Sequence, residues 1–213
     1  MKNTILFGLV TSGLLLSQSA NSADIAIGAL IGQSSFDDIC SVTVVENCDD
    51  SDTSYGFNLT YNFNRTWGIE LGYSDLGTYG GSDTIVETVF DPIAGDLDVV
   101  TDASQDIDLT ALYLAVNASY YFNDQFSVTG RLGVTELDLD SSIRATSTVT
   151  SDIFNITETA SASESFSDST TEAFYGISLN YNFTDALQAQ LRYDLYEGDI
   201  DNFTLGLRYS FGL

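Results

Sequence analysis

The chain has 213 residues, 44% of them apolar, which is enough for one folded domain and too apolar for a disordered chain. It carries 31 Asp and Glu against 6 Lys and Arg, with a formal net charge of -25 and no histidine. This charge argues against nucleic acid as a partner, because few cations are available to neutralise phosphates. The missing histidine removes Ser–His and Cys–His catalysis and His-ligated zinc. We therefore expect no enzyme and no cofactor.

Residues 1–22 are predicted to be a secretory signal peptide. Lys2 supplies the positive start, Ile5 to Leu16 form an apolar stretch, and Ala20 to Ala23 offer small residues for cleavage after Ser22 or Ala23. The stretch is shorter than the roughly 20 residues of a transmembrane helix. We divide the chain into this signal peptide and one domain, 23–213. Because an exported protein meets oxidising conditions, Cys40 and Cys48 are expected to form a local disulfide.

Eight segments alternate between apolar and polar residues with a period of two, which predicts β-strands. The connections 64–66, 123–125 and 184–185 are tight turns, whereas 34–53, 75–108 and 136–172 are long and 196–202 is moderate. Within the long connections, 145–171 is rich in Ser, Thr and Ala and is expected to be mobile or partly ordered. Such alternation favours an up-and-down barrel with turns at one rim and long loops at the other. The segments are at about 24–33, 54–63, 67–74, 109–122, 126–135, 173–183, 186–195 and 203–213.

The apolar face of these segments is bulkier than the polar face, which indicates that the apolar face points outward to lipid. The polar face contains Gly28, Gly56, Gly72 and Gly133 among Asn, Ser and Thr, which suit the interior of an eight-stranded barrel. Aromatic residues recur at both strand ends, as in the two girdles of a membrane barrel rather than in a soluble β-sandwich. They are Phe63, Trp67, Phe122, Phe126 and Phe183 beside the turns, and Tyr55, Tyr73, Tyr175 and Tyr193 at the opposite ends.

The last segment carries the most specific pattern. Thr204-x-Gly206-x-x-Tyr209-x-Phe211 resembles the C-terminal signal that the barrel assembly machinery of the outer membrane reads, although Leu213 stands where the family usually ends in Phe. Together with residues 67–77, WGIELGYSDLG, and 130–134, GRLGV, it makes the chain similar to the OmpA-like, small eight-stranded outer-membrane β-barrel family.

This resemblance implies an all-β, eight-stranded antiparallel up-and-down transmembrane β-barrel with long extracellular loops. It also implies a bacterial outer membrane, periplasmic termini, and contact with outer-membrane lipid and lipopolysaccharide. We expect the barrel domain alone, without the periplasmic peptidoglycan-binding domain of some relatives, and a monomer.

In each strand, residues that alternate with the outward apolar ones point into the lumen. This alternation, which we call the parity of the strand, places five charged residues inside the barrel. Because a buried charge without a partner is costly, we expect Glu70 to bridge Arg131 or Arg208, and Asp194 to engage Arg192 or a neighbour. One interpretation is a gate or selectivity filter. The other, which we favour, is a polar core that fills a narrow barrel.

Twenty-six of the 31 acidic residues fall in the four outer connections. By parity, Asp106 and Asp108 continue the outward face of 109–122, and Glu136, Asp138 and Asp140 continue that of 126–135. These five residues, the acidic ribbon, are a hypothetical site for divalent cations shared with lipopolysaccharide phosphates. A solvated acidic surface is the alternative. The sequence therefore predicts a non-enzymatic envelope barrel that displays acidic loops for ion, surface or partner contact, with a small passive pore as the second hypothesis.

Overall fold

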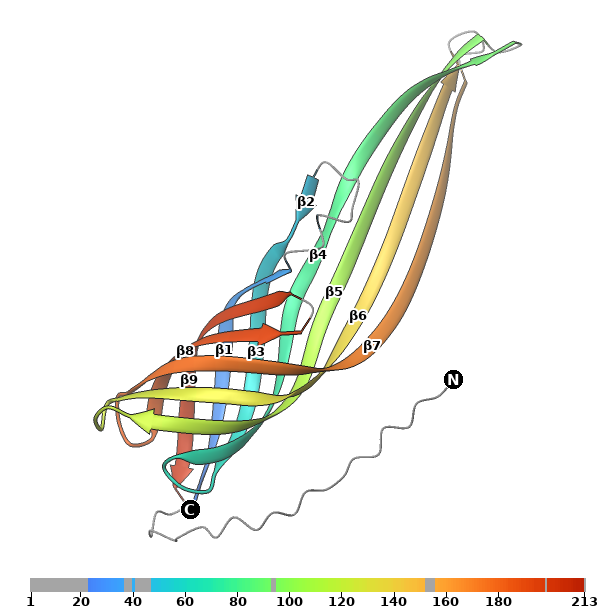
Figure 1. Ribbon diagram of the computed structural model, residues 1–213. Coiled ribbons are helices and arrows are strands. Elements are labelled where there is room, and N and C mark those ends of the chain that lie inside the picture. Colours follow the sequence, from blue (N-terminus) through green and yellow to red (C-terminus); the bar gives the residue numbers. More distant parts are fainter. Residues whose placement is uncertain are drawn as a thin grey trace, which may run out of the picture.

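The computed structural model describes residues 23–36, 40, 47–92, 95–151, 156–197 and 199–212, so the predicted signal peptide and Leu213 lie outside the described residues. The described chain is built from antiparallel strands (Figure 1). They are β1 (Asp24–Phe36), β2 (Asn47–Asp49), β3 (Ser51–Asn62), β4 (Trp67–Asp91), β5 (Gly95–Tyr121), β6 (Phe126–Ser151), β7 (Ile156–Asn182), β8 (Leu187–Tyr196) and β9 (Ile200–Gly212).

Eight of these strands form a closed ring, which confirms the predicted eight-stranded barrel. Each of the eight barrel strands pairs with the next barrel strand along the chain. The ring closes where β1 pairs with β9, from Asp24 opposite Gly212 to Phe36 opposite Ile200. The short β2 pairs only with β4 and stands outside the ring. Closure satisfies the backbone hydrogen bonds of every barrel strand, as a hydrocarbon environment requires. Among the described residues, no helix is long and apolar enough to span a membrane.

The three tight turns lie together at one end of the barrel, which we call the turn end. Each turn is closed by a backbone hydrogen bond, for example from Phe63 N to Trp67 O at 2.9 Å. A side-chain oxygen of Asn64, Asn123 or Thr184 accepts hydrogen bonds from two backbone N–H groups further along its turn. Asn and Thr are favoured in turns for this local bonding.

The outward face of the ring is apolar, as predicted, whereas the inward face combines the predicted small and polar residues with large aromatic ones toward the blade. Leu112 and Leu114 are 48% and 52% exposed, whereas Tyr113 between them is 2% exposed. The aromatic residues predicted at both strand ends point outward, with Trp67 and Tyr73 as examples. Such a belt between two aromatic girdles is the surface that a barrel presents to lipid.

The predicted long loops at 75–108 and 136–172 are wrong for most of their length, because strands cover 75–91, 95–108, 136–151 and 156–172 of the residues that the structure describes. We call these extensions the blade: residues 77–91 of β4, 95–108 of β5, 136–151 of β6 and 156–172 of β7. The blade is a four-stranded sheet that rises far beyond the ends of β1, β3, β8 and β9 (Figure 1). A strand of 27 residues, such as β7, reaches roughly 90 Å, whereas crossing a membrane takes about 10 residues. The end of the barrel that carries the blade is the blade end.

Cross-strand hydroxyl pairs explain why a Ser- and Thr-rich sequence forms strands here. Thr146 and Thr148 of β6 lie opposite Ser161 and Thr159 of β7, with hydroxyl oxygens 3.2 and 3.3 Å apart. Threonine is β-branched and fits a pleated surface, and paired hydroxyls stabilise neighbouring strands. For 145–151 and 156–171, the expectation of a mobile or partly ordered segment is therefore wrong, since composition alone does not reveal the partner strand.

A bulge in β4 marks the start of the blade. The register with β5 shifts between Asp75 and Gly77, and Gly77 has a φ of 93°, a conformation open to glycine. The Asp75 carboxylate accepts a hydrogen bond from Gly77 N at 3.0 Å. The extra residue reverses the parity of β4, so Tyr79 points inward and is buried.

An arginine placed on the outward face should be much more destabilising in the barrel, which faces lipid, than in the blade. We expect Leu114→Arg to lower the free energy of unfolding by about 2–4 kcal/mol, the cost of a cation at mid-membrane. Val86, on the outward face of the blade, is 66% exposed, and Val86→Arg should change stability by less than about 0.5 kcal/mol. Equilibrium urea unfolding in lipid vesicles measures both, and equal effects would contradict this placement of the membrane.

Candidate functional site

A network of charged residues crosses the lumen at mid-height, and Glu70 of β4 is at its centre. One carboxylate oxygen accepts hydrogen bonds from Arg192 Nη2 at 3.0 Å and from the Tyr113 hydroxyl at 3.1 Å. The other oxygen accepts from Thr60 Oγ1 and Asn117 Nδ2, both at 3.2 Å. Glu70 therefore has four donors around one buried carboxylate, which compensates for much of the desolvation of its charge.

Asp194 of β8 joins two of the three inward arginines, Arg131 and Arg192. Its carboxylate accepts a hydrogen bond from Arg131 Nη2, and it lies 3.4 Å from Arg192 Nη2. The side chains of Arg131, Arg192 and Asp194 are only 1–3% exposed. Glu70, Arg192, Asp194 and Arg131 thus form a continuous chain of ion pairs from β4 to β6, which we call the charge network.

The partner of Glu70 differs from the predicted one, and Arg208 has no ion-pair partner among the described residues. Glu70 is paired with Arg192, so the expected direct bridge to Arg131 or Arg208 is wrong, whereas Asp194 engages Arg192 as expected. Parity identified the inward residues but not which side chains reach across. Within the described part of the chain, no acid lies within 4.0 Å of an Arg208 nitrogen.

An apolar cluster closes the lumen above the charge network, on its blade side. Phe174 packs edge-on against Tyr113 and stacks on Tyr196, with ring centroids 5.1 and 5.6 Å apart. Burial raises the pKa of Tyr79 to about 12, so its hydroxyl stays protonated and donates to Leu76 O at 2.8 Å. The remaining buried members of the cluster are Leu76, Ile107, Leu109, Ala111, Ala115, Leu137 and Ile200.

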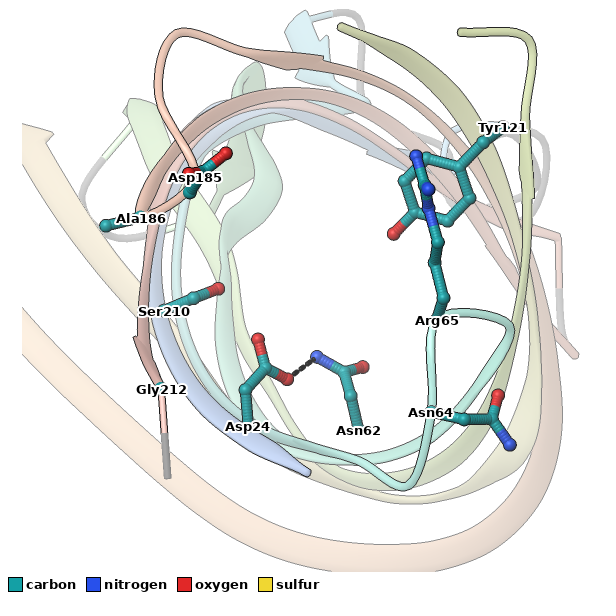
Figure 2. Close-up of a pocket in the computed structure, with 9 residues that line it drawn as sticks. All are labelled: Asp24, Asn62, Asn64, Arg65, Tyr121, Asp185, Ala186, Ser210 and Gly212. Atoms are coloured by element: carbon teal, nitrogen blue, oxygen red, sulfur yellow. Dashed lines mark hydrogen bonds between the residues drawn. The ribbon is translucent and has the colours of Figure 1, made fainter. Parts of the chain in front are cut away.

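The lumen is open below the charge network, at the turn end (Figure 2). A cavity of about 410 Å³ is lined there by Asp24, Asn62, Arg65 and Tyr121 among others, and Asp24 accepts a hydrogen bond from Asn62. A second cavity of about 110 Å³ continues it inward to Arg208. We call the two together the vestibule. No residue of the charge network lines either cavity, so the vestibule ends below the network.

The acidic ribbon lies on the outward face of β5 and β6 at the base of the blade. Asp108 and Asp140 are directly opposite each other, and Asp108 accepts a hydrogen bond from Thr78 Oγ1 at 2.5 Å. Asp106, Glu136 and Asp138 are exposed on the same face. The described residues contain no group of three or more His, Cys, Asp or Glu placed to hold a metal ion. Calcium binding by the ribbon stays a prediction, and a calcium titration with thermal unfolding tests it.

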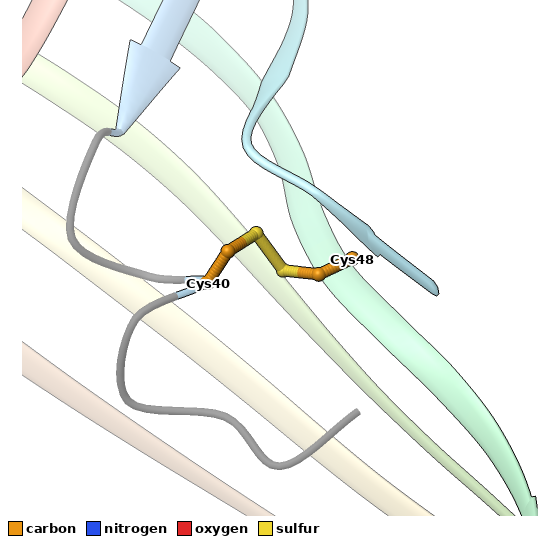
Figure 3. Close-up of a disulfide and its surroundings, with 2 residues drawn as sticks. All are labelled: Cys40 and Cys48. Carbon is orange, nitrogen blue, oxygen red and sulfur yellow. A yellow bond between two sulfur atoms is a disulfide. The ribbon is translucent and has the colours of Figure 1, made fainter. Parts of the chain in front are cut away.

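Cys40 and Cys48 are joined by a disulfide beside the blade end (Figure 3). Both cysteines are packed against the apolar cluster as partly buried residues. The bridge therefore holds Cys40 and Cys48, which lie between β1 and β3 in the sequence, against the apolar cluster.

The residues of the predicted assembly signal occupy β9. Thr204 and Gly206 face the lumen, and Tyr209 and Phe211 face outward with ring centroids 4.8 Å apart. They pair with β1, so the segment also closes the ring. Recognition of this segment by the assembly machinery stays a prediction.

Comparison with known proteins agrees with this architecture. The family model described as an outer membrane protein beta-barrel domain matches residues 6–211. The chain belongs to this family. Its barrel is therefore that of a bacterial outer-membrane protein.

Solved outer-membrane barrels are similar to this chain at low sequence identity. The N-terminal β-barrel domain of Pseudomonas aeruginosa OprF is 13% identical with a TM-score of 0.51, and the match covers 90% of this chain and 100% of that one. P. aeruginosa OprG is 14% identical, with a TM-score of 0.48 and coverage of 90% and 97%. Yersinia pestis Ail is 18% identical, with a TM-score of 0.41 and coverage of 89% and 98%. A comparison with curated proteins gives no match.

Sequence reasoning missed the aromatic half of the lumen. Tyr113 shares its parity with Ala111, Ala115 and Asn117, so it stands out as one large residue in a small inward set. Phe174 and Tyr196 likewise share the parity of inward residues on their own strands. A large aromatic residue on the inward face of a narrow barrel is the signal that would have indicated a closed lumen.

Removal of the central carboxylate should destabilise the barrel strongly. We expect Glu70→Ala to lower the free energy of unfolding by about 3–5 kcal/mol, because it removes the nearer counter-ion of the buried Arg192 and leaves the other donors to Glu70 without their acceptor. Asp138→Ala, at an exposed carboxylate, should change it by less than about 0.5 kcal/mol. Urea titration in lipid vesicles compares the two, and an unchanged stability for Glu70→Ala would refute the network.

Proposed function

We propose that the protein is a non-enzymatic outer-membrane barrel that spans the membrane with a closed lumen and presents the acidic blade outside the cell. The observation that carries this proposal is the division of the molecule along its axis. The lower part is a lipid-facing ring filled by the charge network and the apolar cluster. The upper part is a sheet whose exposed faces are rich in carboxylates and hydroxyls. The first suits anchoring and envelope structure, and the second suits contact with ions, surfaces or partners.

The proposed orientation places the turn end and both termini in the periplasm. Short turns on the periplasmic side and long extensions on the outer side are the usual arrangement of outer-membrane barrels. The start of β1 and the end of β9 lie opposite each other, at Asp24 and Gly212, on the same side as the turns. The blade would then stand above the lipopolysaccharide layer, with the acidic ribbon at the level of its phosphates.

A passive pore is the second candidate, and the vestibule is the observation that favours it. Its cavities of about 410 and 110 Å³ are lined by polar side chains and open at the turn end. A solute entering there meets Arg208 and then the charge network. An eight-stranded barrel leaves an interior that side chains just fill. A closed lumen is therefore the better account of the same residues.

Single-channel recording distinguishes the two candidates. We expect the purified protein in planar lipid bilayers to give no steady openings, because ion pairs and stacked aromatic rings fill the lumen above the vestibule. A conducting porin recorded in the same bilayers is the positive control. Steady openings of uniform size would favour the pore.

Labelling of intact cells tests the orientation. Ser163 in the blade and Gln125 in a turn are both exposed, so each can be replaced by cysteine without burying the thiol. A membrane-impermeant maleimide should label Ser163→Cys on intact cells, and Gln125→Cys only after the outer membrane has been permeabilised. The opposite pattern would invert the proposed orientation.

A further inference from the structure

An apolar cleft lies where the blade leaves the barrel. One wall is the inward face of the blade base, with Leu109 of β5 and Leu137 and Leu139 of β6. The other wall is Phe36 at the end of β1 and Ile200 at the start of β9, which are paired across the two strands. The cleft has a volume of about 190 Å³. We call it the blade cleft.

The rim of the blade cleft is acidic. Asp168 and Glu172 of β7 line it, and Glu197 after β8 lies beside them, since its backbone N–H donates to Ala173 O at 3.3 Å. No Lys or Arg is among the described residues that line it. The lining therefore combines an apolar floor with three carboxylates that no neighbouring cation balances.

Glu172 has an oxygen without a protein donor. Its Oε1 accepts a hydrogen bond from Thr170 Oγ1 at 3.4 Å, whereas its Oε2 is buried and has no hydrogen-bond partner. Because Oε2 is shielded from solvent, a bound molecule would reach the carboxylate at Oε1, whose hydrogen bond from Thr170 is long and exposed.

We propose that the blade cleft binds a small organic cation, an ammonium ion carried on one aromatic or branched alkyl group. The apolar group would occupy the floor between Leu139 and Ile200, and the ammonium would lie at the rim and donate to Glu172. The volume of about 190 Å³ is below the roughly 300 Å³ at which pockets for drug-sized ligands begin, so it suits one apolar group. The formal charge of -25 raises the local concentration of cations and disfavours anions.

This inference deepens the proposed function, since it names a ligand class for the outer part of the molecule. It depends on that function only for the side of the membrane on which the cleft lies. Binding can be measured on the purified full-length protein, to which both ends are accessible, so orientation and conductance do not affect the result.

Methyl NMR spectroscopy with phenethylammonium as the probe tests the proposal. In phosphatidylcholine nanodiscs, the methyl signals of Leu139 and Ile200 should shift and saturate, while those of the lipid-facing Leu207 stay in place. Phenethyl alcohol lacks the charge, phenylacetate reverses it, and ethylammonium lacks the ring. Each of the three should bind more weakly than the probe.

Two variants and a matched control locate the cation and the apolar group. Glu172→Gln should weaken phenethylammonium binding about fivefold, the effect of one partly exposed ion pair. Thr170→Trp should abolish binding, because the new ring fills the cleft from an exposed position on its wall. Glu164→Gln removes the same charge from the same face of β7, further along the blade and outside the cleft lining, and should leave binding within about twofold of the wild type.

The proposal is overturned if the Leu139 and Ile200 signals do not move, or if Glu164→Gln weakens binding as much as Glu172→Gln. The second result would mean that the general negative charge attracts the probe without a specific cleft. If Thr170→Trp does not fold, the comparison of the two Gln variants decides. Absence of binding would leave the closed barrel and its orientation intact, because bilayer recording and cell labelling test those separately.

Discussion

The pairing of β1 with β9 is the constraint on which the rest of the structure depends. In hydrocarbon, an unpaired strand edge would leave a row of backbone N–H and C=O groups without partners, so the ring must close. Once it is closed, every strand has one face toward lipid and one toward a narrow lumen. The alternation of bulky apolar and small polar residues is the consequence of this division. The charged residues inside the ring are a second consequence, because they must neutralise one another.

The lumen is organised in three levels along its axis. The vestibule at the turn end is open and polar, the charge network crosses the middle, and the apolar cluster closes the blade end. The cluster is extended by the Cys40–Cys48 disulfide, whose two cysteines pack against it. On β8 the change from polar to apolar lining occurs between Asp194 and Tyr196. This order separates the interior of the barrel from the surface that the blade offers.

Strand parity allowed the barrel to be predicted from sequence because each of its eight segments repeats the same two-residue alternation. It also placed Glu70, Arg131, Arg192 and Asp194 inside. It did not give the pairing of Glu70 with Arg192, because which side chains meet depends on strand stagger and side-chain length. The blade was missed for a different reason. Its strands are stabilised by hydroxyl pairs such as Thr148 with Thr159, and these become visible only when the partner strand is known.

The blade differs from the barrel in that its sheet does not close. Beyond the end of β8, the described residues place no strand against the outer edge of β7 from 156 to 172, which leaves a long row of backbone groups available for pairing. Such edges cause proteins to aggregate unless charge protects them. Glu158, Glu164, Asp168 and Glu172 have the same parity along this edge, so a second copy approaching it would bring carboxylates face to face. In a crowded membrane, the same acids that attract cations would keep neighbouring molecules of this protein from joining into fibres.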